Sequence, residues 1–316
     1  MDIICAGEML IDFTPGTTFY NYTANPGGAP ANVAIETARN GVKTGFLGVM
    51  GKDDFGHLLM NTLNNNKVTA LCPTLTEEAT TTLAFVTLYE DGERSFTFVR
   101  KPGADMLLSK EHVLANKELI ETTRLFHAGS FSLTSPSAAE AILCGMQLAK
   151  EQEHLVSFDV NYRDTIWENE DACFEKIKPL LSYIDILKIS DEELHFVGGS
   201  EDAIPGFMKQ HNISVVVETL GCKGSKVFFH GESHFMEGKK VNAVDATGAG
   251  DAFFGGFLSY LLLHKVNMCS DFSMKLLKDA LSYANIAGCL CVQKPGGIPA
   301  LPTREEILNM NPLGPS

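Results

Sequence analysis

Short hydrophobic runs alternate with longer stretches of mixed polarity along most of the chain, and this alternation predicts its secondary structure. The hydrophobic runs predict strands at residues 3–6, 44–49, 125–128, 155–159, 184–189, 214–218 and 226–229. The mixed stretches have the length of helices, at residues 30–40, 55–65, 135–150 and 171–181. Strands that alternate with helices are typical of an α/β fold, a mostly parallel sheet with helices on both faces. Continuous apolar runs such as IDILKI and SVVVET fit strands buried on both sides.

Two stretches break this alternation. Residues 81–100 alternate in polarity around Asp91-Gly92, a pair favoured in tight hairpin turns, and residues 13–22 are β-prone and rich in turn formers. Together they predict a small antiparallel sheet at one edge of the main sheet, formed from about residues 13–25 and 81–101. Such a flap is usually a lid or an oligomer contact, so we expect a β lid and a homodimer formed through it. With no internal repeat or linker, we expect one domain over residues 1–316.

Composition narrows the class of protein. The net charge is −14 and the longest basic runs are pairs, so no basic stripe indicates a nucleic-acid partner. Eight scattered cysteines without a CxxC pair, and an N-terminus without a basic segment, predict a cytoplasmic protein with reduced thiols. The longest apolar run, at residues 252–263, is too short to span a bilayer, so we expect no membrane partner. Any anionic substrate then needs local positive charge from backbone amides, a few cations or a metal.

The segment DATGAGDAFFGGF, residues 245–257, carries the first candidate chemistry. It links a β-prone stretch at 241–244 to an apolar helix, so Gly248 and Gly250 fall where bare amides and the helix dipole bind anions. Neither the GxxxxGK[ST] nor the GxGxxG phosphate pattern fits. One interpretation is a capping Asp251 after a flexible turn. The other is that Asp251 takes a proton from a hydroxyl that attacks a phosphate held by the amides.

A second glycine cluster lies near the start of the chain, in GGAPANVA at residues 27–34. Pro30 suits the first turn of a helix, which puts Asn32 in that turn with its amide directed at a ligand. A plain loop that enters a helix explains the proline and the glycines but leaves Asn32 unexplained.

These two segments together resemble the signature motifs of the PfkB, or ribokinase-like, carbohydrate kinase family. Other landmarks agree in order: GEMLIDF at 7–13, GKDDFG at 51–56, LKISDEE at 187–193, TLGCKGS at 219–225 and PGGIPALPT at 295–303. FVRKPGADMLL at 98–108 and FDVNYRDTIW at 158–167 are most similar to the fructokinase branch. The resemblance covers essentially the whole chain. It implies a ribokinase-like three-layer α/β/α core with a β lid, and a phosphotransferase that moves the γ-phosphate of ATP to a sugar hydroxyl.

The resemblance also implies a role for each matching residue. It makes Asp251 the catalytic base, and Gly248, Ala249 and Gly250 the anion hole. It assigns sugar contacts to Asp12, Gly28 and Asn32, with Arg100 and Arg163 near the sugar or the transferred phosphate. It assigns the nucleotide side to Ser190, Thr219, Gly221, Gly224 and Asn285. Asp245 and Thr247, with carbonyls near residues 295–297, match a K⁺ site, and Glu193 would support Mg²⁺ through waters.

Three functions remain open at this point. D-fructose phosphorylated at O6 is the first. A 2-keto-3-deoxygluconate kinase or ribokinase-type enzyme is the second, because Arg100 and Arg163 could bind a sugar acid. An inactive, kinase-like scaffold is the third. Such a protein is expected to lack Asp251 or the glycines of the anion hole, but this chain has both.

Overall fold

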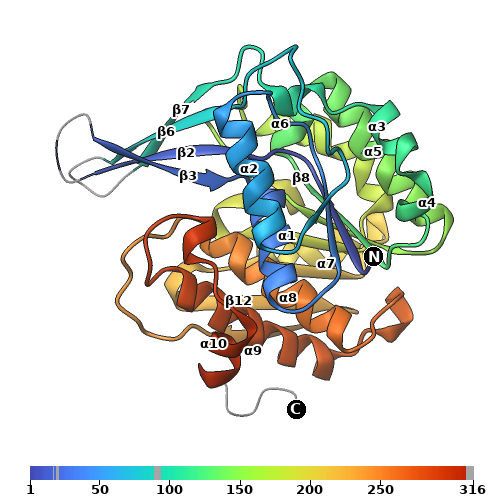
Figure 1. Ribbon diagram of the computed structural model, residues 1–316. Coiled ribbons are helices and arrows are strands. Elements are labelled where there is room, and N and C mark those ends of the chain that lie inside the picture. Colours follow the sequence, from blue (N-terminus) through green and yellow to red (C-terminus); the bar gives the residue numbers. More distant parts are fainter. Residues whose placement is uncertain (17, 19–20, 89–93, 311–316) are drawn as a thin grey trace.

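The computed structural model describes residues 1–16, 18, 21–88 and 94–310, and a large sheet forms its centre (Figure 1). Within this part of the chain nine strands run in the order β13-β12-β11-β10-β9-β8-β1-β4-β5. Neighbouring strands are parallel from β5 to β11, and β12 and β13 add an antiparallel edge. Their bounds are β1 (Ile3–Ala6), β4 (Thr44–Leu47), β5 (Thr69–Ala70), β8 (Leu125–Gly129), β9 (Leu155–Asp159), β10 (Ile186–Ser190), β11 (Val215–Thr219), β12 (Gly224–Phe229) and β13 (Glu232–Glu237).

Helices cover both faces of this sheet. Successive side chains of a strand point to opposite faces, so Ile3 and Cys5 of β1 join one hydrophobic core while Ile4 and Ala6 join the other. The first core is closed by α1 (Ala29–Arg39), α2 (Asp54–Asn65), α8 (Ala249–Leu263), α9 (Met274–Cys291) and α10 (Arg304–Met310). The second is closed by α3 (Lys110–Ala115), α4 (Lys117–Ile120), α5 (Pro136–Glu151), α6 (Glu170–Ile177) and α7 (Ile204–His211). The three predicted layers are therefore confirmed.

A second, smaller sheet projects from one side of this core (Figure 1). Its order is β3-β2-β6-β7, with bounds β2 (Leu10–Pro15), β3 (Tyr22–Gly27), β6 (Leu83–Leu88) and β7 (Arg94–Val99). The pairs β2–β3 and β6–β7 are antiparallel as predicted, but the central pair β2–β6 is parallel. The predicted Asp91-Gly92 turn lies outside the described residues.

Two local predictions were wrong. The helix expected at 171–181 ends at Ile177, and a 3₁₀ helix, Lys178–Tyr183, follows, because Pro179 has no N–H for a helical hydrogen bond. The β-prone residues 241–244 form no strand: the exposed Val244 donates its amide to the carbonyl of Val292 at 2.7 Å. Within the described residues, no helix combines the length and apolar composition that a membrane span requires.

Candidate active site

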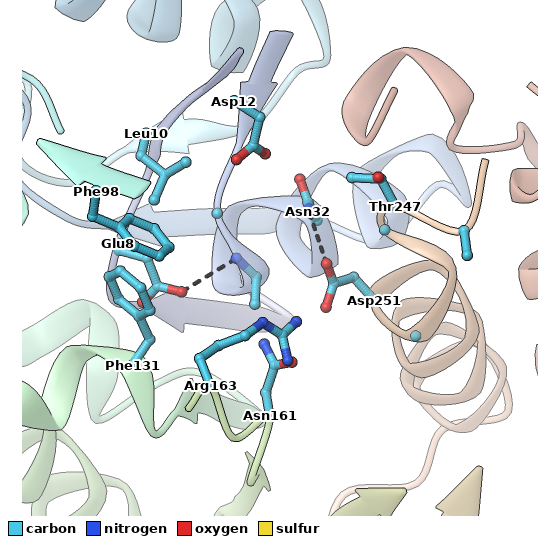
Figure 2. A pocket seen from close by; sticks show the side chains of 15 residues that line it. Glu8, Leu10, Asp12, Asn32, Phe98, Phe131, Asn161, Arg163, Thr247 and Asp251 are labelled. Atoms are coloured by element: carbon cyan, nitrogen blue, oxygen red, sulfur yellow. Dashed lines mark hydrogen bonds between the residues drawn. The ribbon is translucent and has the colours of Figure 1, made fainter. Parts of the chain in front are cut away.

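A cavity of about 250 Å³ lies where the small sheet meets the start of α1 and the start of α8 (Figure 2). Most of its polar lining comes from residues that the sequence had singled out. These are Asp12, Gly28, Asn32, Arg163, Thr247, Gly248, Gly250 and Asp251. The cavity lining as a whole comes from segments far apart in sequence: β2 and the residues before it, α1, β7, the 3₁₀ helix Phe131–Thr134, the loop after β9 and the start of α8.

The start of α8 offers unpaired backbone donors. Gly248 is the N-cap residue with φ 77°, a left-handed conformation that favours glycine, and a Cβ there would lie 3.2 Å from the Cα of Gly297. Among the described residues, no acceptor pairs with the amides of Gly248, Gly250 or Asp251. The amide of Ala249 instead donates to the carbonyl of Ala246 at 3.2 Å, so it is not one of the free donors of this turn. Three free N–H groups and the helix dipole favour an anion at residues 248–251, and we name this segment the anion-binding turn.

Asp251 sits in the first turn of α8 and faces Asn32 in the first turn of α1 (Figure 2). The Asn32 Nδ2 donates to the Asp251 Oδ2 at 2.7 Å. Burial raises the pKa of the Asp251 carboxyl above its ordinary value, and the hydrogen bond from Asn32 opposes this rise. The Oδ1 of Asn32 is buried without a hydrogen-bond partner, and such an acceptor is available to a ligand hydroxyl.

Asp12 presents a second carboxylate to the cavity (Figure 2). It lies within β2 and pairs in register with Asn25 of β3. A Cβ on Gly27 would clash with the Asp12 Oδ2, so a larger residue there would displace this carboxylate. Burial, together with repulsion from Asp251, raises the pKa of Asp12 to about 7.

Arg163 brings positive charge to the cavity on the loop after β9. Its Nη1 donates to the carbonyl of Tyr162 at 2.9 Å, and its charge lowers the pKa of both Asp12 and Asp251. Asn161, two residues earlier, also lines the cavity and holds a φ of 39°, which is rare for a residue other than glycine. Strained backbone of this kind clusters at functional sites.

Arg100 does not reach the cavity, contrary to the expected substrate contact. Its side chain is buried, with 8% exposed. Its guanidinium pairs with Asp105, with 2.6 Å between Nη2 and Oδ2, and donates from Nη1 to Thr134 at 2.6 Å. It also stacks 4.4 Å above the ring of Phe131. Arg100 therefore packs against Phe131, a residue whose side chain lines the cavity.

The sequence interpretation missed one side of the cavity, formed by Glu8, Leu10, Phe98 and Phe131 (Figure 2). Glu8 accepts from the amide of Ala29 at 3.2 Å and from the Ser132 hydroxyl at 2.7 Å. Burial raises the pKa of Glu8 to about 7. In the sequence, only the position of Glu8 in GEMLIDF pointed to the site. Glu8 is four residues before Asp12, a spacing that places two side chains on the same side of an extended chain.

The predicted nucleotide residues form a second group at the carboxyl ends of β10 and β11. Ser190 pairs in register with Thr219, and Thr219 pairs with Ser225. The Ser225 hydroxyl donates to the Oδ1 of Asn285 on α9 at 2.8 Å. Gly221 and Gly224 bound the short turn between β11 and β12. This group does not line the cavity and lies on the same face of the sheet as α8 and α9.

Asp245 and Thr247 are joined to the turn at 295–297. The Asp245 Oδ1 accepts from the Thr247 amide at 2.9 Å and from its hydroxyl at 2.7 Å, while Oδ2 accepts from the Gly296 amide at 2.9 Å. Among the described residues, no three acidic, histidine or cysteine side chains group to hold a metal ion. The K⁺ site expected at Asp245 and Thr247 stays a prediction.

Glu193 is bound by backbone amides. Its Oε1 accepts from Tyr162 at 2.6 Å and its Oε2 from Ser190 at 2.8 Å, so it caps the 3₁₀ helix Asp191–Val197. Burial raises the pKa of Glu193, and Lys188 opposes the rise. The carboxylate thus fixes the end of β10, and its support of Mg²⁺ stays a prediction.

Comparison with known proteins identifies this arrangement. The model of the pfkB family of carbohydrate kinases matches residues 1–304. The chain belongs to the pfkB family of carbohydrate kinases. A "Probable fructokinase-5" from Arabidopsis thaliana is 41% identical over 310 residues, which cover 95% of this chain and 94% of the relative.

Solved structures of fructokinases share the fold over nearly the whole chain. Fructokinase from Xylella fastidiosa with bound ATP superposes with a TM-score of 0.84 at 30% identity, covering 98% of this chain and 97% of the other. A double mutant of fructokinase from Vibrio cholerae, in a form with fructose, ADP and potassium ion, reaches 0.87 at 30% identity, with 97% of each chain covered. The chain is therefore a phosphotransferase with the ribokinase-like fold. In a pfkB kinase, a carboxylate beside free amides can accept a proton while the amides hold phosphate.

Proposed function

We propose that this pfkB kinase phosphorylates D-fructose at O6 with Mg·ATP as the phosphoryl donor. The observation that carries the proposal is the position of Asp251, whose carboxylate shares one cavity with three free amides at the start of α8. A proton acceptor and an anion-binding turn within the same helical turn suit attack of a hydroxyl on a phosphoryl group.

The chemical step follows from this arrangement. The Asp251 carboxylate accepts the proton of the primary hydroxyl of the sugar while the hydroxyl oxygen attacks the γ-phosphorus of ATP. The new O–P bond forms while the bond between the γ-phosphorus and the β–γ bridging oxygen breaks, and ADP leaves with that oxygen. Charge that develops on the transferred group is stabilised by the amides of Gly248, Gly250 and Asp251 and by the dipole of α8.

The cavity lining favours a neutral sugar. Asp12 can accept from two adjacent hydroxyls, and the buried Oδ1 of Asn32 accepts another. The alternative of a sugar-acid substrate needed both Arg100 and Arg163 to bind the acid group. Arg100 binds Asp105 and Thr134 instead, so Arg163 is the one arginine of the two that lines the cavity. Two further carboxyls, Glu8 and Asp12, would repel an anionic substrate. The name of a relative at 41% identity, "Probable fructokinase-5", supports the same choice.

The nucleotide belongs beside the second polar group. We assign ATP to the edge formed by Ser190, Thr219, Gly221, Gly224 and Asn285, with its γ-phosphate directed at the start of α8. Mg²⁺ would enter with ATP, and Glu193, held by the amides of Tyr162 and Ser190, would support it through water. When bound, a K⁺ ion held by Asp245, Thr247 and carbonyls at 295–297 would add positive potential beside the anion-binding turn.

The remaining assignments concern the whole chain. We assign the small sheet as a lid over the sugar and as the contact of a homodimer, within one kinase domain over residues 1–316. A cytoplasmic location is supported by the eight cysteines, all within the described part and all free, as is typical of reducing compartments.

The proposal is tested by a coupled assay of ADP release with ATP and a panel of fructose, ribose and 2-keto-3-deoxygluconate. We expect kcat/KM to be highest for fructose, with the phosphate on O6. A higher kcat/KM for 2-keto-3-deoxygluconate or ribose would show that fructose is not the substrate, while the proposed phosphoryl transfer would still hold. Absence of turnover with every sugar, by a protein that still binds ATP, would favour the scaffold interpretation.

A further inference from the structure

A buried ion pair lies beneath the anion-binding turn, and no step of the proposed reaction has used it. Lys188 of β10 is directly opposite Asp159 of β9, and its Nζ lies 2.8 Å from each carboxylate oxygen. Both residues are buried, with 5% and 1% exposed. The ammonium has three N–H donors, and the carboxylate engages two of them.

The pair occupies the face of the sheet that α8 covers. Earlier residues on this face of the two strands, Leu155 and Ile186, belong to the hydrophobic core under α8. A Cβ on Gly250 would lie 3.6 Å from the Lys188 Nζ, so the ammonium rests against the first turn of the helix. Lys188 is also two residues from Ser190, where the nucleotide group begins.

Stability alone does not account for this pair. Moving two charges out of water is costly, and apolar residues of similar volume often replace a buried ion pair without loss of stability. One step deeper on this face, Ile186 of β10 lies opposite Ser157 of β9, and neither residue is charged. An uncharged pair would therefore continue the strand surface. The charges sit instead at the carboxyl edge, where ligands bind in open α/β sheets.

Resting on the proposed function, we propose that Lys188, fixed by Asp159, is a positioning residue for phosphoryl transfer. Its ammonium holds a full positive charge beneath the turn at 248–251, on the protein side of the site where the γ-phosphate binds. Asp159 keeps the ammonium in place and keeps it charged: although burial acts to lower the pKa of Lys188, the Asp159 carboxylate raises it.

The two members of the pair act on Asp251 in opposite directions. Burial is the main cause of the raised pKa of Asp251; Asp159 adds to the rise, while Lys188 and Arg163 oppose it. Asp12 also faces Asp251 across the cavity, and Cys291 lies near it on α9. Loss of the ammonium alone should therefore move the acid limb of the kcat/KM profile to higher pH, whereas loss of the Asp159 charge alone should move it lower.

The test compares Lys188→Met, Asp159→Asn and the double variant with the wild type, using fructose and ATP. We expect kcat to fall about 100-fold in Lys188→Met, the lower end of the range seen when one oxyanion donor is removed, with a smaller change in the KM for fructose. The acid limb should shift up in Lys188→Met and down in Asp159→Asn. The double variant removes both charges of the pair, so it should fold with wild-type cooperativity and still show the lowered kcat.

Lys150→Met is the matched control. Lys150 makes the same two-oxygen contact with Asp185, at 2.8 and 3.0 Å, before the opposite end of β10. Its loss should lower thermal stability and leave kcat and the pH profile unchanged. Wild-type kcat in a folded double variant, or acid limbs that shift in the same direction in both single variants, would overturn the role of Lys188. A wild-type enzyme without sugar turnover would overturn the proposed function instead.

Discussion

Asp251 needs a free carboxylate in order to accept a proton, so its ionisation sets the acid limb of the activity profile. Asn32 donates to that carboxylate and thereby lowers its pKa against the effect of burial. Asn32→Ala removes the donor, so the carboxylate stays protonated to higher pH. We expect the acid limb of the kcat/KM profile to move to higher pH and the KM for fructose to rise.

The measurement is kcat/KM across pH for the wild type and Asn32→Ala. Asn116→Ala serves as the control, because Asn116 donates to the carbonyls of Leu71 and His112, which are not part of the cavity lining. Its profile should match the wild type. An acid limb that is unchanged or lower in Asn32→Ala would contradict the assigned role of this hydrogen bond.

At this scale, residues in local motifs could be placed from the sequence and residues that depend on distant partners could not. The spacing of Gly248 and Asp251 fixes their place in one helical turn, so the motif was sufficient. Arg100 was misplaced because its direction is set by Asp105 and Thr134, which no local pattern links to it. Phe131 was missed because its ring enters the cavity from a 3₁₀ helix after β8.

The packing of α8 against α1 determines where Asp251 stands. A Cβ on Gly255 would lie 2.7 Å from both the Cβ and the Cγ of Glu36, which is fully buried on α1. Gly255→Ala should therefore force the two helices apart and lower the free energy of unfolding by about 1–3 kcal/mol, the usual cost of overpacking. Asp251 is one helical turn away, so kcat should fall as well.

Gly206 of α7 provides the matched control, since a Cβ there meets nothing within 4 Å. Gly206→Ala should leave kcat unchanged and raise the free energy of unfolding by about 0.4–1 kcal/mol, through loss of freedom in the unfolded chain. Urea unfolding and steady-state assays of both variants are the measurements. Equal stability of the two alanine variants would show that the α1–α8 contact tolerates a methyl group.

Strands could be predicted from the sequence where a short hydrophobic run is compatible only with a buried strand. Strands β1 and β9 begin and end at the residues expected from their apolar runs. The parallel pairing of β2 with β6 was missed, because Asp12 and its partner Ala84 are far apart in sequence and only the fold brings the strands together. An alternating pattern indicates a strand but not the direction of its neighbour.

For the whole molecule, we expect a homodimer that forms through the small sheet. Tyr22 on β3 and Val99 on β7 are 40% and 51% exposed at the two edges of this sheet, and exposed apolar edge residues favour strand association. The double variant Tyr22→Asp, Val99→Asp should sediment as a monomer at concentrations where the wild type is a dimer. A wild type that sediments as a monomer at assay concentration would exclude this contact.

The account as a whole depends on the carboxylate of Asp251, and turnover of Asp251→Asn with fructose and ATP tests it most directly. Asparagine keeps the size of the side chain but cannot take the proton. We predict that kcat falls by about 10²–10⁴-fold, the usual contribution of a general base, while calorimetry still detects fructose binding. A kcat close to that of the wild type would contradict the mechanism.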